Sequence, residues 1–343
     1  MKPLTYRDAG VDIEAGEEAV RRLAPHARRT SRPEVLGGIG AFASFVQVPA
    51  GYREPVLVSS TDGVGSKLKI AFQADRHDTV GIDLVAMGVN DVLVHGAEPL
   101  YFLDYVGVAH VDPARIEHVV AGVAEGCRRA GCALVGGEIA ELPDLYRPGE
   151  YDLAGFAVGV VEKSRIIDGA AVRPGDIVLG LASSGLHANG YSLGRRILFD
   201  VLGLSLDALL PGTGRSVADV MLEPTRIYVR PVLHVRERVH AMAHITGGGL
   251  PGNLPRVLPQ GCRAILRPAT WRDSVAPVFA VLREAGRISP DEMYRTFNMG
   301  IGYVVVVPAV DAGAVTAALA AEGETVHVIG EIVAGERGVE LAE

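Results

Sequence analysis

The sequence is poor in cysteine and contains no long apolar run. Three cysteines, Cys127, Cys132 and Cys262, stand among the 343 residues. This number is odd and too small for a disulfide framework, and no Cys/His cluster has zinc-ligand spacing. No stretch of about 18 apolar residues could span a bilayer, and the N-terminus lacks the apolar core of a signal peptide. The sequence therefore predicts a soluble, cytoplasmic protein with no membrane partner.

Basic charge is also scarce. The chain has 33 lysines and arginines against 41 aspartates and glutamates, which gives a formal net charge of -8. Because such a field repels polyanions, we expect no nucleic-acid partner. An anionic small molecule would need local help from a lysine, a helix N-terminus or a metal ion.

Strand-like and helix-like segments are mixed in both halves of the chain. Short β-rich runs, several of them almost continuously apolar, indicate buried strands, and segments with apolar residues at helical spacing indicate helices. The order is not the strict alternation of a doubly wound sheet, so we predict an α+β fold with a mixed sheet and packed helices in each domain. We expect strands at 54–60, 99–110, 132–138, 151–162, 177–184, 240–249, 302–309 and 327–333, and helices at 81–96, 112–131, 191–203 and 311–323.

The length predicts two domains, at about 150 residues for each. Around Asp168 the pattern pauses at "DGAAVRPGD" and then restarts with a new strand. We therefore expect an N-terminal domain at 1–168 and a C-terminal domain at 169–343.

The stretch "TDGVGSK", which ends at Lys67, places a lysine close behind two glycines. Glycine lets backbone N–H groups approach an anion, and the ammonium adds a compact charge, so the pattern is compatible with phosphate binding. It is not a Walker A motif, because that motif needs G-x-x-x-x-G-K-[ST]. The alternative is a turn at a strand end with an exposed lysine.

Three acids lie near glycines at the ends or flanks of predicted elements. Asp62 follows a strand, Asp91 lies on the flank of an otherwise apolar helix, and Glu138 ends the run "CALVGGE". Buried charge is costly unless it is paired or bound to a metal, and a few carboxylates together with phosphates suit Mg²⁺. The alternative is that each acid merely caps a turn or faces solvent.

The turn "SSGLHANG" falls where a strand leads into a helix of the second half. Backbone N–H groups at a helix start bind anions, so this turn could hold a substrate phosphate, although an ordinary capped helix is the alternative. His187 in this turn and His244 in "HITGGG" are candidates for proton transfer, although a lone histidine is more often structural. The candidate phosphate contacts are Ser183, Ser184, Gly185 and Asn189.

Segments over nearly the whole chain resemble one known family. "TDGVGSKLKIA", "GIDLVAMGVND", "GCALVGGEIAELP", "AGFAVGVVEKS", "SSGLHANGYSL", "HITGGGLPGNLPRVLP" and "FNMGIGYVVVV" are similar to the phosphoribosylformylglycinamidine cyclo-ligases, also called aminoimidazole ribonucleotide synthetases, of purine biosynthesis. "DVLVHGAEP" also matches the D-x-x-x-x-G-A-x-P signature of a wider ATP-using superfamily, which includes thiamine-monophosphate kinase, selenophosphate synthetase and a hydrogenase-maturation protein.

The resemblance implies an ATP-dependent closure of formylglycinamidine ribonucleotide to 5-aminoimidazole ribonucleotide, with release of ADP and phosphate. ATP phosphorylates the formamide oxygen, and the amidine nitrogen then closes the ring as phosphate leaves. On this basis Asp62, Asp91 and Glu138 would hold Mg²⁺ on the triphosphate, and Lys67 would neutralise charge on the transferring group. The implied catalytic residues are Lys67, Asp91, His187 and His244, and the implied nucleotide contacts are Asp12, Asp62, Gly63, Gly65, Ser66, Lys67, Asn90 and Gly137.

The same resemblance extends to the N-terminal segment and to assembly. "YRDAGVDIEAGEEAVRRL" suits a mobile arm that orders over ATP, with Asp12 as a possible contact. The family forms a homodimer in which first-domain strands from two subunits pair. The runs "PLYFLDYVGVAH" and "YDLAGFAVGVVE" could supply that surface, although apolar strands fit a monomer's core equally well.

The chain departs from the family's sequence pattern at two positions, and two other functions are also compatible with the sequence. Ile139 stands where the family usually has Thr, which removes a possible contact to metal-bound water, and Ser66 replaces a Thr but keeps the hydroxyl. Another small-molecule kinase of the superfamily would share the acids but lack the "SSGLHANGYSL" turn. A catalytically silent nucleotide-binding subunit would be expected to lack Lys67 or one of the acids.

Overall fold

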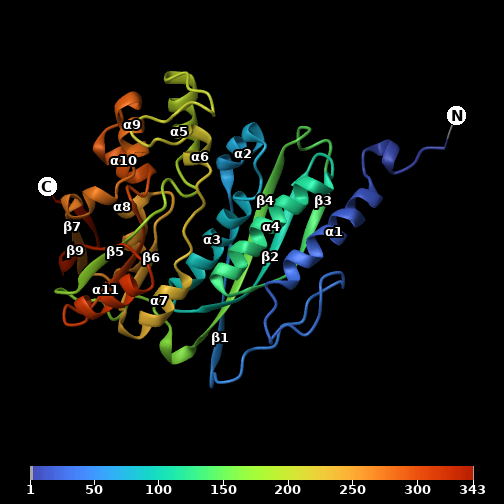
Figure 1. The fold of residues 1–343 in the computed structure, drawn as a ribbon. Helices are drawn as coiled ribbons and strands as arrows, with labels where there is room; N and C mark the ends of the chain where they lie inside the picture. The colour runs from blue at the N-terminus through green and yellow to red at the C-terminus, as the bar shows by residue number, and fades with distance from the viewer. Residues whose placement is uncertain (1–2, 343) are drawn as a thin grey trace.

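The first half of the chain forms one β-sheet with helices packed on one face. In the computed structural model, which describes residues 3–342, helices lie on one face of this sheet and along one of its edges (Figure 1). The helices are α1 (Ile13–Arg28), α2 (Leu68–Ala74), α3 (Val80–Leu93) and α4 (Pro113–Ala130), and the strands are β1 (Pro55–Gly63), β2 (Glu98–Val108), β3 (Ala133–Glu141) and β4 (Tyr151–Glu162).

The strand order in this sheet is β1-β4-β2-β3, so β1 and β3 are the two edges. β2 and β3 run parallel and are joined through α4, whereas the other neighbours are antiparallel. α4 begins cleanly because Asp112 accepts hydrogen bonds from the N–H groups of Ala114 and Arg115, and it ends at Gly131 in the left-handed conformation. α1 packs along α4 and the β3 edge.

α3 lies between the sheet and the rest of the molecule. All of its fourteen residues except Asp91 are buried. It approaches α4 so closely that a Cβ on Gly81 or Gly122 would collide with the backbone of the other segment. A helix that is apolar all round needs partners on every side, and the second domain supplies the last of them.

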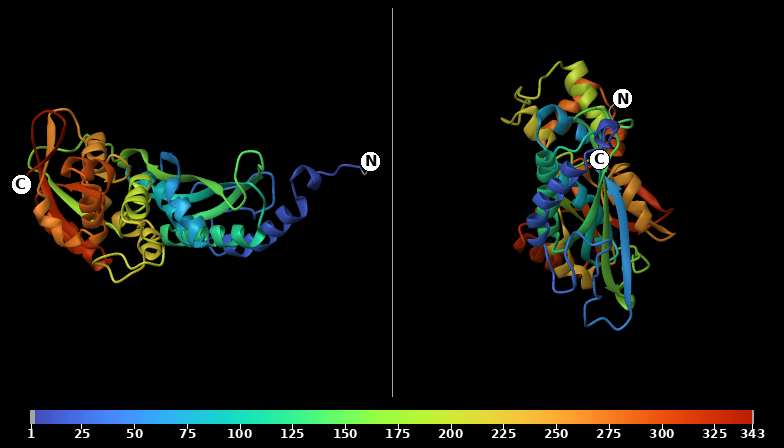
Figure 2. Two further views of the ribbon diagram at one scale, coloured as in Figure 1. Left: turned by 90° about the horizontal axis from the view of Figure 1, so that it is seen from above. Right: turned by 90° about the vertical axis from the view of Figure 1, so that its right-hand side faces the viewer.

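The second half forms a six-stranded mixed sheet with the order β10-β7-β9-β5-β8-β6. Seen from above, the two sheets lie end to end along an elongated molecule, and the termini lie at opposite ends (Figure 2). The strands are β5 (Ile177–Ala182), β6 (Ala241–His244), β7 (Cys262–Leu266), β8 (Ile301–Val307), β9 (Val326–Ala334) and β10 (Gly338–Leu341), and the helices are α5 (Tyr191–Arg195), α6 (Val217–Met221), α7 (Val229–Val235), α8 (Gly249–Asn253), α9 (Pro277–Gly286), α10 (Pro290–Thr296) and α11 (Ala312–Ala321).

The predicted α+β class with two domains is confirmed. One sheet ends at Glu162 and the next begins at Ile177, and the boundary at Asp168 stays a prediction. From Ile13 onward, the segment expected to be an arm over ATP forms the regular helix α1, and its action over ATP stays a prediction. Within residues 3–342, no helix is both long and apolar enough to cross a membrane.

Candidate active site

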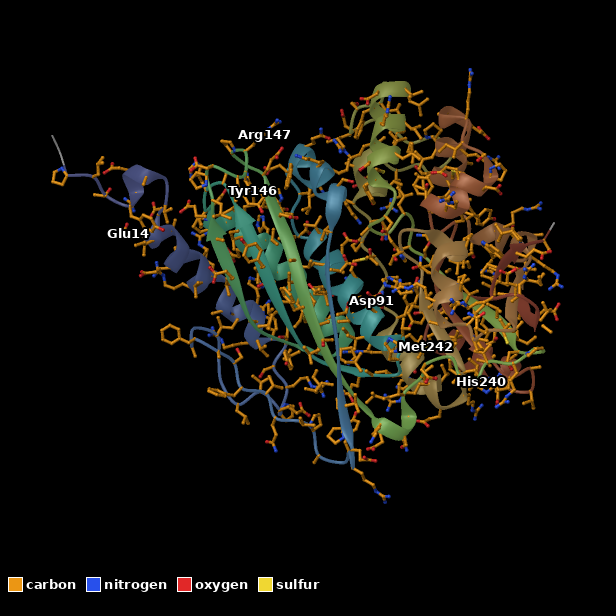
Figure 3. All side chains as sticks on the ribbon, turned by 180° about the vertical axis from the view of Figure 1, so that it is seen from behind. Glu14, Asp91, Tyr146, Arg147, His240 and Met242 are labelled. Atoms are coloured by element: carbon orange, nitrogen blue, oxygen red, sulfur yellow. The ribbon has the colours of Figure 1, made fainter. Side chains whose placement is uncertain are left out.

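Asp91 meets the second domain at the exposed flank of α3. Its Oδ1 accepts a 2.9 Å hydrogen bond from Nδ1 of His244, at the end of β6. Its Oδ2 accepts a 3.2 Å hydrogen bond from the hydroxyl of Ser60 on β1. Figure 3 shows Asp91 where α3 approaches Met242 of β6. Both domains therefore position this carboxylate.

Asp62 and Asp91 influence each other electrostatically. Burial raises the pKa of Asp62, the hydrogen bond from the Gly63 N–H opposes this, and the neighbouring charge of Asp91 raises it further. Burial also acts to raise the pKa of Asp91, but the hydrogen bond and charge of His244, together with Ser60 and Arg256, outweigh it, so the net shift is downward. Two carboxylates that repel each other in a partly buried place fit a bound cation, which would relieve the repulsion.

A cavity of about 250 Å³ opens beside Asp91, between the two domains. Nε2 of His244 is buried and has no hydrogen-bond partner. Arg256 lines the same space and donates a hydrogen bond to Asn253. We call this space the interdomain cavity; its polar lining is Ser59, Ser60, Asp91, His95, His244, Asn253 and Arg256.

Sequence reasoning overlooked Ser60, His95 and Arg256 in this lining. Arg256 carried a usable signal, because it is the sole charged residue in the glycine-rich run "HITGGGLPGNLPRVLP" apart from a titratable His. His95 lies four residues after Asp91 but beyond the end of α3, in the turn that follows the helix.

Lys67 does not lie exposed behind its glycines. Its ammonium is fully buried and pairs with Asp83 of α3 at 2.8 Å. It also donates to the backbone carbonyls of His187 and Glu223, at 3.0 and 2.6 Å. Burial acts to lower the pKa of Lys67, whereas the charge of Asp83 acts to raise it. All three N–H donors are thus used inside the protein, and its role toward a phosphoryl group stays a prediction.

The "TDGVGSK" loop and the "SSGLHANG" turn nevertheless meet. Besides the bond from Lys67 to the carbonyl of His187, the hydroxyls of Ser66 and Ser192 lie 3.0 Å apart. Gly65 adopts a φ of 68°, a left-handed conformation that suits glycine, where the loop turns toward α2. The two stretches singled out as phosphate candidates therefore form one junction between the domains.

Much of the polar capacity of the second turn is used internally. The hydroxyl of Ser183 donates to Asn298, and that of Ser184 donates to the carbonyl of Pro224. Asn298 in turn donates to the carbonyl of Gly185. Nδ2 of Asn189 is buried with no partner, so it is a side-chain donor of this turn that remains available for a ligand.

His187 is held as a neutral ring. Burial lowers its pKa well below the ordinary value, and the nearby charges of His244 and Lys67 act in the same direction. Nε2 accepts a 3.2 Å hydrogen bond from the N–H of Ser184, so the proton belongs on Nδ1, which has no partner. The residue adopts a φ of 60°, which is uncommon for a side chain of this size.

The three predicted metal ligands do not converge within one protomer. Asp62 is on β1 and Glu138 is on β3, and these are opposite edges of the sheet. With strands about 4.8 Å apart, three spacings separate the two edges by roughly 14 Å. No group of three or more acidic, histidine or cysteine side chains suited to a metal occurs among residues 3–342.

Two further predicted contacts have structural partners. Asn90 is buried, donates to the carbonyl of Arg226 and accepts from the N–H of Tyr228. Asp12 caps α1 by accepting from the N–H of Ala15, and it pairs with Arg7 at 2.8 Å. Gly137 lies on the edge strand β3, and the N–H group of Gly63 donates a hydrogen bond to the carboxylate of Asp62. Contacts of these four residues with a nucleotide stay predictions.

The fold and its sequence pattern define a class of two-domain protein. Residues 44–161 match the family described as "AIR synthase related protein, N-terminal domain", and residues 173–342 match the corresponding C-terminal domain. A solved thiamine-monophosphate kinase from Stenotrophomonas maltophilia K279a has the same fold, with a TM-score of 0.68 and 20% identity over 94% of this chain and 95% of that one.

Relatives at higher sequence identity show which family within this class the chain belongs to. A phosphoribosylformylglycinamidine cyclo-ligase of Symbiobacterium thermophilum is 57% identical over 98% of this chain and 97% of its own length. The protein of that name from Methylobacillus flagellatus is 56% identical over 98% and 96%. The chain belongs to the phosphoribosylformylglycinamidine cyclo-ligase family, which confirms the resemblance drawn from its motifs.

Proposed function

We propose that this chain catalyses the ATP-dependent closure of formylglycinamidine ribonucleotide to 5-aminoimidazole ribonucleotide. The γ-phosphoryl group moves from ATP to the formamide oxygen, which leaves ADP. The amidine nitrogen then attacks the activated carbon, phosphate departs with the former formyl oxygen, and one proton is lost. The observation that carries the proposal is Asp91 in the lining of a polar interdomain cavity, with its charge acting on the neighbouring Asp62, in a chain that belongs to the cyclo-ligase family.

Magnesium fits the first-domain side of this cavity. Asp62 and Asp91 offer oxygen ligands, and their mutual repulsion is the kind of cost that a cation removes. When bound, Mg²⁺ would screen the charge of the triphosphate. Arg256, on the opposite wall, adds a permanent positive charge within the same lining.

The two histidines differ in the proton that each can offer. His244 directs Nδ1 to Asp91 and leaves Nε2 without a partner, so Nε2 is suited to accept the proton lost on ring closure. His187 carries its proton on the unpartnered Nδ1 and is suited to donate a hydrogen bond. Asn189, with its unpartnered amide, is the side chain of the turn best suited to bind the ribose phosphate.

A homodimer would explain the position of Glu138. The face of the first sheet that turns away from α3 exposes Leu57 on β1 and Phe156 on β4, at 55% and 44% of their surfaces. Pairing of this face with a second copy would cover them and could bring Glu138 of the partner subunit to Asp62 and Asp91.

Mixing two inactive variants tests this arrangement. If each site combines Asp91 of one copy with Glu138 of the other, mixed Asp91→Asn and Glu138→Gln chains recover about a quarter of the parent activity, because half of the dimers carry one intact site. Light scattering at monomer mass, or no recovery in subunits shown to exchange, would contradict the shared site.

The cellular setting of the proposal is the cytoplasm. Cys127, Cys132 and Cys262 are free and buried thiols, which supports a reducing compartment. The net charge of -8 supports a small-molecule substrate and no nucleic-acid partner.

One assay separates the proposed reaction from the alternatives. ADP release is measured with Mg-ATP and either formylglycinamidine ribonucleotide or thiamine monophosphate. Release with the first substrate alone is expected. Release with thiamine monophosphate would indicate a kinase of the wider superfamily, and release with neither would indicate a silent nucleotide-binding subunit.

A further inference from the structure

Lys67, the cation expected to act on the phosphoryl group, has all of its N–H donors engaged inside the fold. Its ammonium pairs with Asp83 at 2.8 Å and donates to the carbonyl groups of His187 and Glu223. Phosphoryl transfer depends on positive charge that touches the oxygens of the transferring group. Because Lys67 would have to break internal bonds to make that contact, the fold favours another cation for it.

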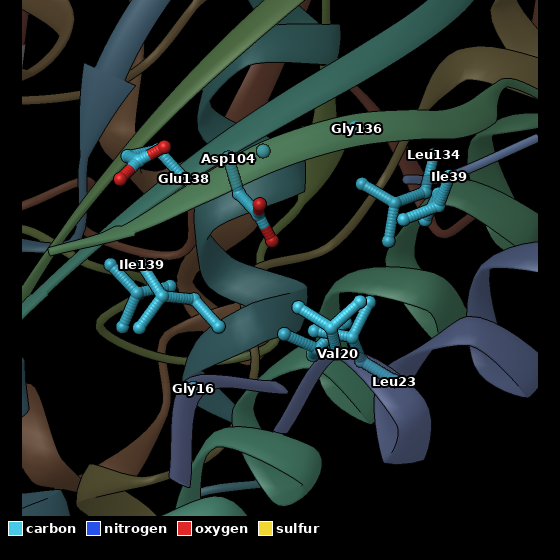
Figure 4. Close-up of a pocket in the computed structure, with 12 residues that line it drawn as sticks. Gly16, Val20, Leu23, Ile39, Asp104, Leu134, Gly136, Glu138 and Ile139 are labelled. Atoms are coloured by element: carbon cyan, nitrogen blue, oxygen red, sulfur yellow. The ribbon is translucent and has the colours of Figure 1, made fainter. Parts of the chain in front are cut away.

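The cavity between α1 and the β2–β3 edge offers no such cation. It measures about 270 Å³, and its described lining includes the acids Asp104 and Glu138 but neither lysine nor arginine. Figure 4 shows the carboxyl group of Asp104 directed into the space between the sheet and the α1 residues Val20 and Leu23. Its Oδ2 is buried and has no hydrogen-bond partner. A lining of acids and apolar groups does not attract phosphoryl oxygens, so the contact belongs elsewhere.

Arg256 is the one lysine or arginine among the described residues that line the interdomain cavity. It lies in the short 3₁₀ helix Leu254–Val257, which follows α8. Leu254 and Leu258 are buried in the core of the second domain, at 0% and 3% exposure, whereas Arg256 is exposed. The core therefore fixes the backbone of this segment and leaves the guanidinium at the cavity.

A buried asparagine orients this guanidinium. Nδ2 of Asn253 donates to the carbonyl groups of Thr246, Gly247 and Gly249, so the side chain is fixed in the glycine-rich turn. Oδ1 of Asn253 accepts a 3.3 Å hydrogen bond from Nη1 of Arg256. Within residues 3–342 the guanidinium makes no ion pair, so its remaining N–H groups are available to a ligand.

The charge of Arg256 reaches Asp91 across this cavity. Burial acts to raise the pKa of Asp91, and the charge of Arg256 is among the influences that lower it. A phosphoryl group fits between the two residues, because its oxygens attract a planar guanidinium on one side and a metal ion held by the acid on the other. The turn at Asn189 is the proposed place of the ribose phosphate, so Arg256 remains for the transferring group.

We propose that Arg256 contacts the transferring phosphoryl group and acts as the catalytic cation of the interdomain cavity. This inference rests on the proposed function and names a further residue for its first step. The bond from the γ-phosphorus to ADP breaks with its electron pair on ADP, and a lone pair of the formamide oxygen forms the new bond. Arg256 keeps its protons throughout and stabilises the negative charge on the transferring oxygens.

Arg256→Gln tests this contact, because glutamine can still donate to Asn253 but carries no charge. Turnover should fall by at least about a hundredfold, whereas the Michaelis constant of the ribonucleotide should change by less than about threefold. Arg256→Lys restores the charge without the planar fork, so its turnover should exceed that of Arg256→Gln by at least about tenfold. Arg238→Gln, which removes an exposed arginine of the second domain that does not line the cavity, is the matched control and should retain parent turnover.

Calorimetric titration of the full chain measures the same contact without turnover. The probes are the Mg²⁺ complexes of ADP and of the non-hydrolysable analogue β,γ-imido-ATP, which differ in the γ-phosphoryl group. Arg256→Gln should bind the imido analogue about tenfold more weakly than the parent does and bind ADP equally well. If Arg256→Gln does not fold, the same titrations with Arg256→Lys replace it, and a weakening confined to the imido analogue is again expected.

Two results would overturn the proposal. One is an equal effect, or no effect, of the substitution on the two nucleotides. The other is a raised Michaelis constant for the ribonucleotide with parent-like turnover, which would assign Arg256 to the ribose phosphate. The proposed function fails separately, if the parent chain releases no ADP with formylglycinamidine ribonucleotide.

Discussion

His244 of β6 donates a 2.9 Å hydrogen bond to Asp91 of α3, so a histidine of one domain orients an acid of the other. The imidazole has its second nitrogen free, whereas the carboxylate also accepts from Ser60. Because Nδ1 of His244 is held by Asp91 and Nε2 has no partner, Nε2 is available to bind a ligand. This relationship makes the junction of the domains, and not either domain alone, the place where chemistry is expected.

Asp91→Asn tests the predicted metal ligand. The amide keeps an oxygen for His244. The end of the repulsion with Asp62 offsets part of the lost attraction between Asp91 and His244, so we expect a melting temperature without ligand that is unchanged or slightly lowered. Turnover should fall by at least about a hundredfold, because an electrostatic contact to the transferring group is lost. Normal turnover, or an unfolded chain, would assign Asp91 a structural role.

Lys67→Met tests whether the buried lysine is structural. It leaves the carboxylate of Asp83 buried without its partner, which should destabilise the fold by about 3–5 kcal/mol in urea unfolding. The double variant with Asp83→Asn removes the orphaned charge and keeps an acceptor for Thr225, so part of the loss should return. Turnover then decides the role: a folded double variant with parent-like turnover would contradict the predicted action of Lys67 on the phosphoryl group.

Asn189→Asp tests the phosphate turn. A carboxylate in place of the unpartnered amide would stand against a phosphate dianion, so the Michaelis constant should rise far more for the ribonucleotide than for ATP. Steady-state kinetics with each substrate varied in turn provide the comparison. Similar increases for both substrates would count against the assignment.

The buried carboxyl of Asp104 predicts a dependence of stability on pH. Burial raises its pKa from 3.8 to about 7. Between these values the unfolded chain has lost the proton that the folded chain retains, so the group lowers the free energy of unfolding as pH rises from about 4 to 7. The full effect is at most about 4 kcal/mol, at 1.36 kcal/mol for each pKa unit.

Urea unfolding of the parent and of Asp104→Asn at pH 5 and pH 8 measures this effect. The parent should lose stability relative to the variant at the higher pH, since contributions from other groups cancel in the difference. A constant difference would mean that the carboxyl group is already ionised at the lower pH.

Local sequence patterns were sufficient for most of the elements that build the site. The runs at 99–110 and 151–162 became β2 and β4, and the helical spacing at 81–96 became α3. Asp91 was found because a charge in an apolar helix is conspicuous. The position of Glu138 was not predictable in the same way, because the strand order that separates β3 from β1 is set by long-range pairing.

Two side chains show where local reasoning fails. Lys67 was expected to be exposed or to meet phosphate, but two of its acceptors, the carbonyl groups of His187 and Glu223, come from residues more than a hundred positions later. Asp104 did leave a signal: in "YFLDYV" it has the same alternation as Phe102 and Val106, which places it on the core face of the strand. An acid at a core position of a strand was the observation to pursue.

The buried junction around α3 has a consequence for synthesis on the ribosome. When residues 1–168 have emerged, Lys67 and Asp83 are both present, but the carbonyl groups of His187 and Glu223 and the hydroxyl of Thr225 are not. The side chain of Asn90 likewise lacks its partners, the carbonyl group of Arg226 and the N–H group of Tyr228. The nascent first domain thus lacks hydrogen-bond partners for these polar side chains until about sixty further residues follow, at roughly 5–20 residues per second. During those seconds the side of α3 that packs on α7 and β6 is uncovered.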